Sequence, residues 1–320
     1  MPQIDMSLEK LKAYQGKNPR PADFDAFWDK SLEELNTIDP APVFTKADIS
    51  CAFADLYELR FTSTKGARIY AKVAVPKHEK GERLPTILKF HGLSGNGGAF
   101  FDLLPFAAQG FVMATMDSRG QGGYSEDVGG VAGTTYTHPF IRGIEGPPEG
   151  LLVRDLFLDT AMLARVMMAQ DFVDGTRMAA MGQSQGGALS VACAALVPSI
   201  KLCAPCFPYH ADYLRVWEMD LAKGAYEGLR YYFRWFDPAH EREEEIFTKL
   251  GYIDIQNLAP RVRAKTFWTT CLMDTTCPPS TQFAAYNKMT CEKEMLIYPD
   301  YAHELPSSHK DKTFTFLSEL

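Results

Sequence analysis

The chain of 320 residues carries 33 Lys and Arg against 40 Asp and Glu, which gives a net charge of −7 at neutral pH. This acidic balance argues against nucleic acid or an anionic membrane surface as the main partner. The hydrophobic content of 46% and the charged content of 23% are ordinary for a soluble globular protein. No stretch approaches the roughly 18 apolar residues that a membrane span needs.

The N-terminus and the cysteines bear on the cellular compartment. The first residues, MPQIDMSLEKLKAYQGK, mix charges and lack the apolar segment of a signal peptide. The seven cysteines are an odd number scattered along the chain, which favours reduced thiols over a disulfide framework. We therefore expect a cytoplasmic protein.

The sequence contains no internal repeat, low-complexity tract or flexible linker, and this favours a single domain over residues 1–320. Residues 1–50 form an N-terminal extension with one amphipathic helix, for which Asp23 is the expected N-cap. The apolar face of that helix consists of Phe24, Phe27, Trp28, Leu32 and Leu35. Two β-rich runs follow, at 56–62 and 68–75, and are expected to pair antiparallel.

From residue 85 onward, strands and helices alternate. The expected strands are 86–91, 111–117, 177–181, 201–204, 265–272 and 294–298, and the expected helices are 101–108, 152–170, 185–196, 280–289 and 309–319. This alternation predicts the α/β class, with a mostly parallel central sheet and helices on both faces.

Residues 207–262 interrupt the alternation and are predicted to form a helical insertion. The segment is rich in aromatic residues, among them Tyr209, Tyr213, Trp217 and Tyr226. These side chains either pack against the body of the protein or a neighbouring subunit, or form a wall of a substrate pocket. The sequence leaves both interpretations open.

The segment Gly182-Gln183-Ser184-Gln185-Gly186 matches Gly-x-Ser-x-Gly. An apolar run precedes it and an Ala-rich helix follows, which is the strand–turn–helix setting of a nucleophile elbow. Flanking glycines allow the tight turn that holds the serine in a strained backbone conformation. We therefore predict an α/β-hydrolase fold with Ser184 as the nucleophile.

A serine nucleophile needs a histidine base and a carboxylate that orients the base. In this fold the acid and the base follow the serine in that order, each in a loop after a strand. His303 follows the strand at 294–298 and is the expected base. Asp274 follows the strand at 265–272 and is the expected acid. For the oxyanion hole, we predict the backbone N–H groups of Gln185 and Leu93.

Five segments together carry a resemblance to a known family. They are Phe-His-Gly at 90–92, Asp-Ser-Arg-Gly-Gln-Gly at 117–122, Gly-Gln-Ser-Gln-Gly-Gly at 182–187, the stretch 272–287 with Asp-Thr-Thr-Cys-Pro-Pro-Ser-Thr, and Ile-Tyr-Pro…His-Glu at 297–304. With these segments the chain resembles carbohydrate esterase family seven, the acetyl xylan esterase and cephalosporin C deacetylase group.

The resemblance implies a serine esterase that removes acetyl groups from small esters, such as acetylated xylo-oligosaccharides and cephalosporin C-type acetates, through an acetyl-enzyme. It also implies a cytoplasmic homohexamer, with Arg119 and Gln121 bracing loops near the site. His91 is expected to brace the oxyanion loop, and His91, Pro208 and Tyr209 are candidates for the substrate pocket. Leu93 stands where the family usually has Tyr, which makes the pocket wall less polar.

No cofactor or catalytic metal is expected, because the chain has no His-Glu-x-x-His motif and the Cys203-x-x-Cys206 pair has no second ligand pair. Two other functions remain open. One is a serine peptidase of the prolyl-oligopeptidase type, against which the lack of a propeller-sized N-terminal region counts. The other is a non-catalytic binding protein on a hydrolase fold, against which the complete triad counts.

Overall fold

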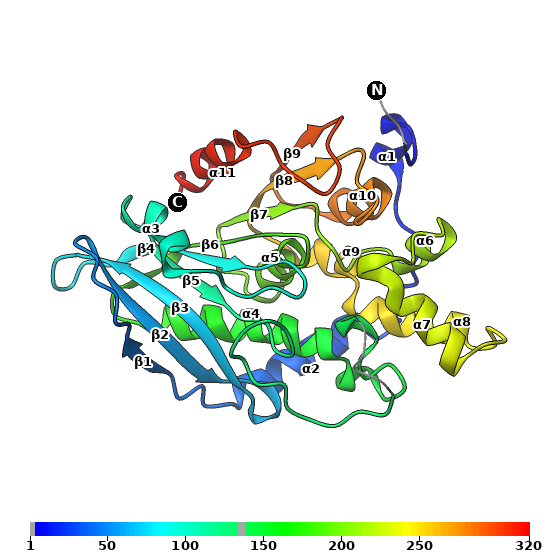
Figure 1. The fold of residues 1–320 in the computed structure, drawn as a ribbon, viewed down its shortest axis with the longest axis horizontal. Coiled ribbons are helices and arrows are strands. Elements are labelled where there is room, and N and C mark those ends of the chain that lie inside the picture. Colours follow the sequence, from blue (N-terminus) through cyan, green and yellow to red (C-terminus); the bar gives the residue numbers. More distant parts are fainter. Residues whose placement is uncertain (1–3, 134–137) are drawn as a thin grey trace.

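A computed structural model describes residues 4–133 and 138–320, and one nine-stranded sheet runs through this part of the chain (Figure 1). The strand order is β1-β2-β3-β5-β4-β6-β7-β8-β9. The strands are β1 (Val43–Lys46), β2 (Ala54–Thr62), β3 (Arg68–Pro76), β4 (Leu84–Phe90), β5 (Val112–Met116), β6 (Val173–Gln183), β7 (Leu202–Cys206), β8 (Lys265–Cys271) and β9 (Lys293–Tyr298).

The sheet has an antiparallel edge and a parallel body. Strands β1, β2 and β3 pair antiparallel in sequence, and β3 also pairs antiparallel with β5. From β5 to β9 each neighbouring pair is parallel. Strands of a parallel body are covered on both faces, so they read as continuous apolar runs. Every residue of β5 and of β7 is accordingly buried.

Helices cover the parallel body on both faces, as the alternation predicted. On one face, Leu88 and Ala180 share a core with α4 (Leu152–Met168) and α5 (Gln185–Leu196). On the other face, Ile87 and Ala179 share a core with α3 (Leu104–Ala107) and α11 (His309–Leu317). Successive strand residues point to opposite faces, which is why the neighbours in β4 and β6 divide between the two cores.

The N-terminal extension lies outside the first of these cores. Helix α2 (Phe24–Asn36) packs on α4, with Phe24, Phe27, Trp28 and Leu35 buried as predicted and Leu32 partly buried against the same core. Asp23 stands at the N-cap position, but its side chain makes no cap hydrogen bond. Residues 1–3 of the extension lie outside the described part of the chain.

Some element boundaries differ from the prediction. The expected helix over 101–108 is a 3-10 turn, Phe100–Leu103, followed by the single helical turn of α3. Pro105 lacks an N–H group and is tolerated only in the first turn of a helix, so a new helix begins there. Strand β6 starts at Val173, earlier than predicted, and the exposed strand β1 was not predicted at all.

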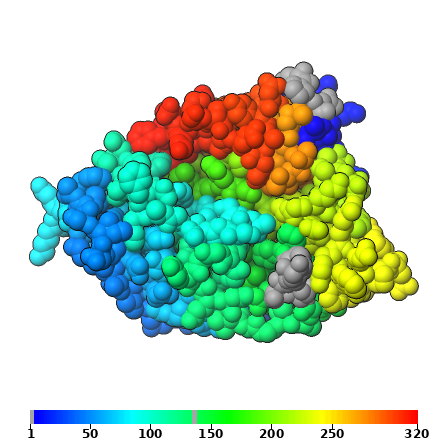
Figure 2. Space-filling view, viewed as in Figure 1, coloured from blue at the N-terminus to red at the C-terminus, as the bar shows by residue number. Residues whose placement is uncertain are grey.

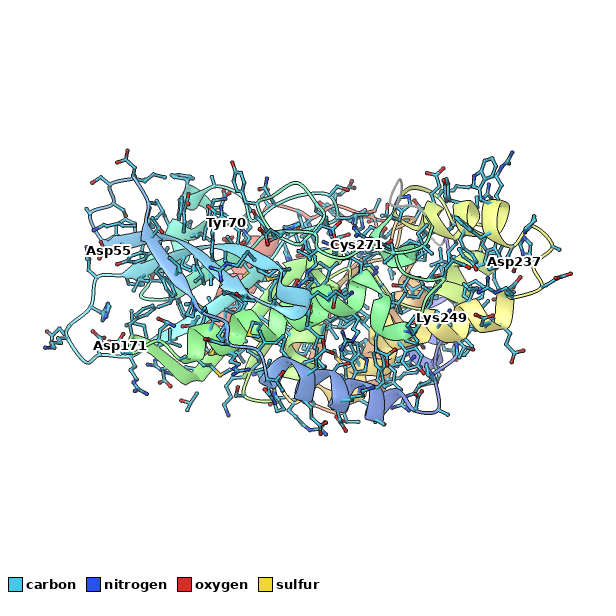
Figure 3. All side chains as sticks on the ribbon, turned by 90° about the horizontal axis from the view of Figure 1, so that it is seen from below. Asp55, Tyr70, Asp171, Asp237, Lys249 and Cys271 are labelled. Carbon is cyan, nitrogen blue, oxygen red and sulfur yellow. The ribbon has the colours of Figure 1, made fainter. Side chains whose placement is uncertain are left out.

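The insertion, residues 207–262, is helical as predicted. Its helices are α6 (Tyr213–Glu218), α7 (Glu227–Phe236), α8 (Glu243–Leu250) and α9 (Ile255–Leu258). The insertion packs against α5 and against α10 (Pro279–Lys288), and α1 (Leu8–Ala13) covers α10 from outside. In Figure 3, Asp171 before β6 lies at one end of the molecule, and Asp237 and Lys249 of the insertion lie at the other. The insertion therefore lies beyond the carboxyl ends of the central strands.

Asp212 joins the N-terminal extension to the insertion. Its carboxylate accepts hydrogen bonds from the backbone N–H groups of Lys17 at 3.0 Å and Asn18 at 2.8 Å, and from the Tyr14 hydroxyl at 2.7 Å. Both segments thus contribute to one partly buried hydrogen-bonded network.

Two further observations concern the cysteines and the helices. All seven cysteines are free thiols. In the described part of the chain, no helix combines the length and the apolarity that a bilayer crossing requires.

His210 leads to a prediction on acid stability. Burial lowers the pKa of this histidine to about 3. The unfolded chain binds a proton below about pH 6.5 while the folded protein does not, so this group's contribution to stability is complete above pH 6.5 and is lost as the pH falls. We expect the free energy of unfolding to drop by up to about 1.4 kcal/mol per pH unit from this group between pH 6 and pH 4.

The matched variant is His210→Asn, which tolerates the positive φ of 59° at this position and does not titrate. Urea unfolding at several pH values should give a shallower acid decline for the variant. Burial raises the pKa of Asp254 to about 7, so this group changes the free energy of unfolding with pH in the opposite direction. Asp254 is present in both the parent protein and His210→Asn, so its contribution cancels when the two are compared. Equal slopes would refute the assignment.

Candidate active site

Ser184 lies in the sharp turn between β6 and α5. Its backbone has φ of 56° and ψ of −121°, a region that non-glycine residues rarely adopt. A Cβ atom at Gly186 would lie 2.1 Å from the carbonyl oxygen of Phe90, and one at Gly182 would lie 2.4 Å from the carbonyl oxygen of Gly186. Only glycine fits at these two positions, so the turn has the strained geometry that the sequence predicted for a nucleophile elbow.

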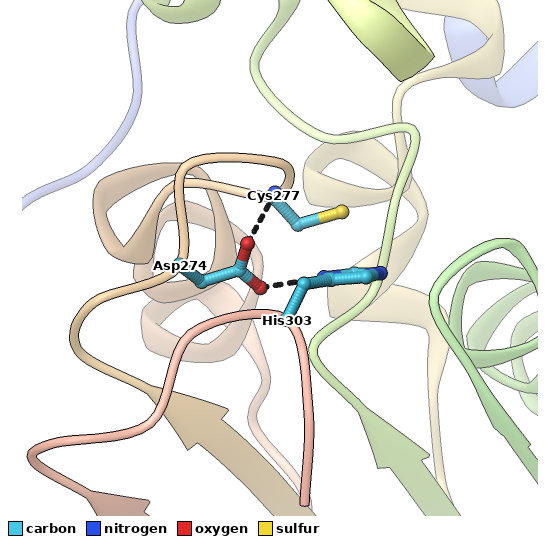
Figure 4. A group of neighbouring side chains, drawn as sticks. All are labelled: Asp274, Cys277 and His303. Carbon is cyan, nitrogen blue, oxygen red and sulfur yellow. Dashed lines mark hydrogen bonds and ion pairs between the residues drawn. The ribbon is translucent and has the colours of Figure 1, made fainter.

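Asp274 and His303 meet at the same edge of the sheet, in the loops after β8 and β9. The Asp274 carboxylate is fully buried, and its Oδ2 lies 2.8 Å from His303 Nδ1 (Figure 4). Its Oδ1 accepts hydrogen bonds from the N–H groups of Thr276 and Cys277, both at 2.8 Å. Two N–H groups of its own loop and the imidazole thus hold the carboxylate in one orientation, and the carboxylate in turn orients the imidazole.

No hydrogen bond joins Ser184 Oγ to His303 among the described contacts of these two residues. Nucleophile–base hydrogen bonds are often long in ligand-free proteins and tighten when a substrate binds. The structure thus brings Asp274 and His303 of the predicted triad into hydrogen-bond contact and places Ser184 in its turn at the same edge of the sheet.

Two residues beside His303 were not identified from the sequence. Phe207, directly after β7, packs its ring against the imidazole with a centroid distance of 4.4 Å and an interplanar angle of 43°. Cys277 is fully buried, and its sulfur lies within 4.8 Å of ligand atoms of Asp274 and His303. Both follow strand ends, as Asp274 does, so their place in the chain was a usable signal.

A metal site is an alternative interpretation of Asp274, Cys277 and His303, because their potential ligand atoms lie within 4.8 Å of one another. The donor set does not fit a metal. Both Asp274 oxygens already accept hydrogen bonds. The pKa of the Cys277 thiol lies well above its ordinary value, because the thiol is buried and, as a smaller cause, because the Asp274 carboxylate is close to it. A metal needs the thiolate, so we interpret the cluster as a hydrogen-bonded carboxylate–imidazole pair.

The two predicted oxyanion donors are free. Neither the N–H group of Leu93 nor that of Gln185 has an acceptor in the described structure. The N–H group of Ser94 next to Leu93 is occupied, because it donates to Gln121 Oε1 at 2.9 Å. Gln121 also bonds to the side chain of Gln185, with Nε2 2.8 Å from Gln185 Oε1. Gln121 thereby fastens the two halves of the candidate oxyanion hole to each other.

His91 braces the same loop from inside. Its Nε2 accepts a hydrogen bond from the N–H group of Ser118 at 2.9 Å, and its Nδ1 lies 2.7 Å from the carbonyl oxygen of Gly92. One ring nitrogen accepts and the other donates, which defines a neutral imidazole with its proton on Nδ1. Burial lowers the pKa of His91, which favours that neutral form. The contacts are those of a loop brace.

Arg119 is fully buried and binds the carboxylate of Asp159 on α4, with Nε and an Nη atom 2.7 and 2.6 Å from its two oxygens. The remaining nitrogen, Nη1, donates to the carbonyl of Thr64, and Nη2, which also binds Asp159, donates to the Thr64 hydroxyl. The resemblance implied that Arg119 braces loops near the site. Its main partner is a carboxylate of α4, because two parallel N–H donors match the two oxygens of Asp159.

The residues considered for the substrate pocket have different surroundings in the structure. The Tyr209 side chain is fully buried among Tyr226 and Phe140, and its hydroxyl donates to the carbonyl of Ala225, so it offers no surface to a substrate. Pro208 lies close to Gly187 of α5. Leu93 lines a cavity of about 430 Å³ that also includes Gln121, His138 and Arg142.

Comparison with known proteins indicates the family of the chain. The acetyl xylan esterase family model matches residues 1–320. The chain belongs to the acetyl xylan esterase family. This is a family of carboxylic ester hydrolases, and the match confirms the fold class and the family that the sequence motifs indicated.

Three similar proteins support the assignment. Acetyl xylan esterase 1 from Thermoanaerobacterium sp. JW/SL YS485 is 47% identical with a TM-score of 0.97, and 99% of each chain is covered. The acetyl xylan esterase from Paenibacillus sp. R4 is 32% identical with a TM-score of 0.94, covering 98% of this chain and 99% of that one. Acetyl esterase Axe7A from Xylanibacter ruminicola is 28% identical over 315 residues, and the match covers 94% of this chain and 66% of that protein.

A more distant likeness shows the fold alone. The acylaminoacyl peptidase from Pyrococcus horikoshii is 19% identical with a TM-score of 0.57, and the match covers 83% of this chain and 41% of that one. The hydrolase fold is therefore shared with peptidases.

We expect His91→Phe to lower kcat for p-nitrophenyl acetate by about 10²-fold with little change in KM. The phenyl ring keeps the volume but loses both hydrogen bonds, so the Leu93 N–H group moves from its position, and displacements of about 1 Å in a site cost this much. Steady-state kinetics tests it. The control is His78→Phe, which changes a histidine outside the site and should keep the parent kcat. An unchanged kcat in His91→Phe would show that His91 does not hold the loop in its active position.

Arg119→Met should lower the free energy of unfolding by about 3–5 kcal/mol, because Asp159 would remain as a buried carboxylate without its counter-ion. Urea denaturation measures the change. The control is Arg177→Met, which removes a partly exposed ion pair with Asp174 and should cost about 1 kcal/mol or less. Similar losses in both variants would contradict the importance of the buried pair.

Proposed function

We propose that this protein is a serine esterase that removes acetyl groups from small esters, with acetylated xylo-oligosaccharides and cephalosporin C-type acetates as its substrate class. The observation that carries the proposal is the His303–Asp274 hydrogen bond at the sheet edge that also holds the strained Ser184 elbow. Membership of the acetyl xylan esterase family supports acetyl as the acyl group that is removed. No cofactor is required for this chemistry.

In the first half-reaction, His303 takes the proton of Ser184 and the serine oxygen attacks the acetyl carbonyl. The backbone N–H groups of Leu93 and Gln185 stabilise the negative charge on the tetrahedral intermediate. Asp274 stabilises the imidazolium that forms and keeps it in the productive orientation. His303 then gives its proton to the departing alcohol, and an acetyl-enzyme remains.

In the second half-reaction, water replaces the alcohol. His303 takes a proton from the water, which attacks the acetyl-enzyme, and the same two N–H groups stabilise the second intermediate. Acetate leaves and Ser184 regains its proton. Helix α5 begins directly after Ser184, so its N-terminus adds partial positive charge on the side where the oxyanion forms.

The cavity beside Leu93 fits a polar leaving group. It is lined by Gln121, His138 and Arg142 together with the apolar Leu93 side chain. The amide, the imidazole and the guanidinium can hydrogen bond with the hydroxyl groups of a sugar. The apolar Leu93 adjoins the position of the reacting acetyl group, which supports a small acyl chain and a polyhydroxylated alcohol.

The assembly, the compartment and the domain organisation are part of the proposal. We propose a cytoplasmic homohexamer on the basis of the family resemblance, with residues 1–320 folded as one domain. Seven free cysteines support the reducing compartment, and the contacts of Asp212 with the N-terminal extension support a single folding unit. Light scattering of the purified protein measures the number of subunits directly.

Ser184→Ala should lower kcat for p-nitrophenyl acetate by about 10⁴-fold or more, because the covalent step is lost and only binding and the oxyanion donors remain. Asp274→Asn should cost a similar factor, because the amide supports the wrong imidazole tautomer. Ser199→Ala changes a serine outside the site and should leave kcat unchanged.

Near-normal turnover by Ser184→Ala would overturn the proposal. A panel of substrates separates the other functions. A preference for aminoacyl amides over acetyl esters would favour the peptidase, and a failure of a fluorophosphonate probe to label Ser184 would favour a binding protein.

A further inference from the structure

A second pocket lies on the opposite side of the nucleophile elbow from α5. Its volume is about 490 Å³, within the ordinary range for small-molecule sites. Its floor is formed by Lys89 of β4 and by Met181 and Gln183 of β6, and its walls by the segment Phe101–Phe106 and by α11. In Figure 2 a hollow lies between the red C-terminal segment and the teal segment near residue 100, with green atoms of the central strands at its base.

The pocket is separate from the candidate active site. Ser184, Asp274 and His303 do not line it. It shares the elbow with that site, however, because Gly182 and Gln183 directly precede Ser184 and contribute to its floor. A molecule bound there would contact the strand end that presents the nucleophile.

The walls are aromatic and partly exposed. The ring of Phe106 packs against that of Phe314 at 5.6 Å, which joins α3 to α11 at one side of the pocket. Phe101 is 76% exposed and Phe314 is 36% exposed, although both are large apolar side chains. Exposed aromatic residues that gather around one hollow are typical of a binding site for an apolar group.

Lys89 is the polar group that points to the class of ligand. Its ammonium group has no hydrogen bond, ion pair or ring contact among the described residues, although burial is sufficient to lower its pKa. Asp102, Lys310 and Asp311 also line the pocket, and Asp102 is engaged as the acceptor for the N–H group of Ala99 at 2.8 Å. The charge of Asp102 acts favourably on Lys89 through space and that of Lys310 opposes it, but neither group hydrogen bonds with the ammonium, so a carboxylate bound beside Lys89 would give it a direct partner.

We propose that this pocket is a second binding site, for a small amphipathic carboxylate whose aryl or alkyl part lies against Phe101, Phe106 and Phe314 and whose carboxylate pairs with Lys89. This site is independent of the chemistry at Ser184. Its occupant is recognised by an ion pair at the floor and by apolar contact at the walls.

The test uses 4-phenylbutyrate as the probe and neutral 4-phenylbutyramide as its matched control, with binding followed by calorimetry or ligand-detected NMR. We expect saturable binding of the carboxylate with a Kd of about 1 mM or tighter. Lys89→Met should weaken carboxylate binding at least about 10-fold and leave binding of the amide unchanged. Phe101→Ala, at an exposed position, should weaken both probes by about three-fold or more.

The control variant is Lys312→Met, on α11 but outside the pocket, which should bind both probes as the parent protein does. All variants should hydrolyse p-nitrophenyl acetate within about two-fold of the parent rate, which shows that they are folded. Binding should persist in protein whose Ser184 is blocked by a fluorophosphonate. If Ser184 cannot be labelled, the proposed esterase mechanism fails, while binding to untreated protein and to Lys89→Met still tests the pocket.

Three results would overturn the proposal. One is the absence of saturable carboxylate binding to the parent protein. Another is equal affinity of the parent and Lys89→Met for the carboxylate. The third is a loss of binding on blocking Ser184, since that would place the probe in the active site.

Discussion

The backbone of the β6–α5 turn passes so close to the end of β4 that no side chain fits between them. A Cβ atom at Gly186 would lie 2.1 Å from the Phe90 carbonyl oxygen. At this close approach Ser184 has a positive φ, and the strain is sustained because β6 is paired on both sides, with β4 and with β7. The sheet thus determines the position of the elbow, and the other predicted site residues lie around it.

The loops that follow neighbouring strands provide those other groups. Parallel strands end at one edge, so residues far apart in the sequence converge there without a dedicated structure to hold them. Asp274 is oriented by two backbone N–H groups of its own loop, and His303 is held between that carboxylate and the ring of Phe207. The oxyanion loop is fastened separately, by His91 and Gln121.

The sequence was sufficient for the fold class, the elbow and the Asp274–His303 pair, because chain order and strand ends are properties of the pattern itself. It was insufficient where a side chain could point either way. Tyr209 was a candidate for the pocket, yet its ring lies in the aromatic core of the insertion. The prediction of one helix over 101–108 was wrong, since a separate helix begins at the turn that contains Pro105. Phe207 and Cys277 follow strand ends, which was a usable signal, but the contact of the Phe207 ring with His303 is seen only in the structure.

The two histidines near Ser184 have opposite requirements for their protons. In the proposed reaction His303 gains and loses a proton twice in each turnover, so its ring must exchange protons readily. His91 is held with one nitrogen as donor and the other as acceptor, and a second proton on its ring would turn the Ser118 N–H group from a partner into an obstacle. The proton on His303 is therefore mobile and the proton on His91 is not, although both histidines lie near the same serine. Any chemical treatment that modifies imidazoles would then inactivate the protein by two routes, one through the base and one through the shape of the loop.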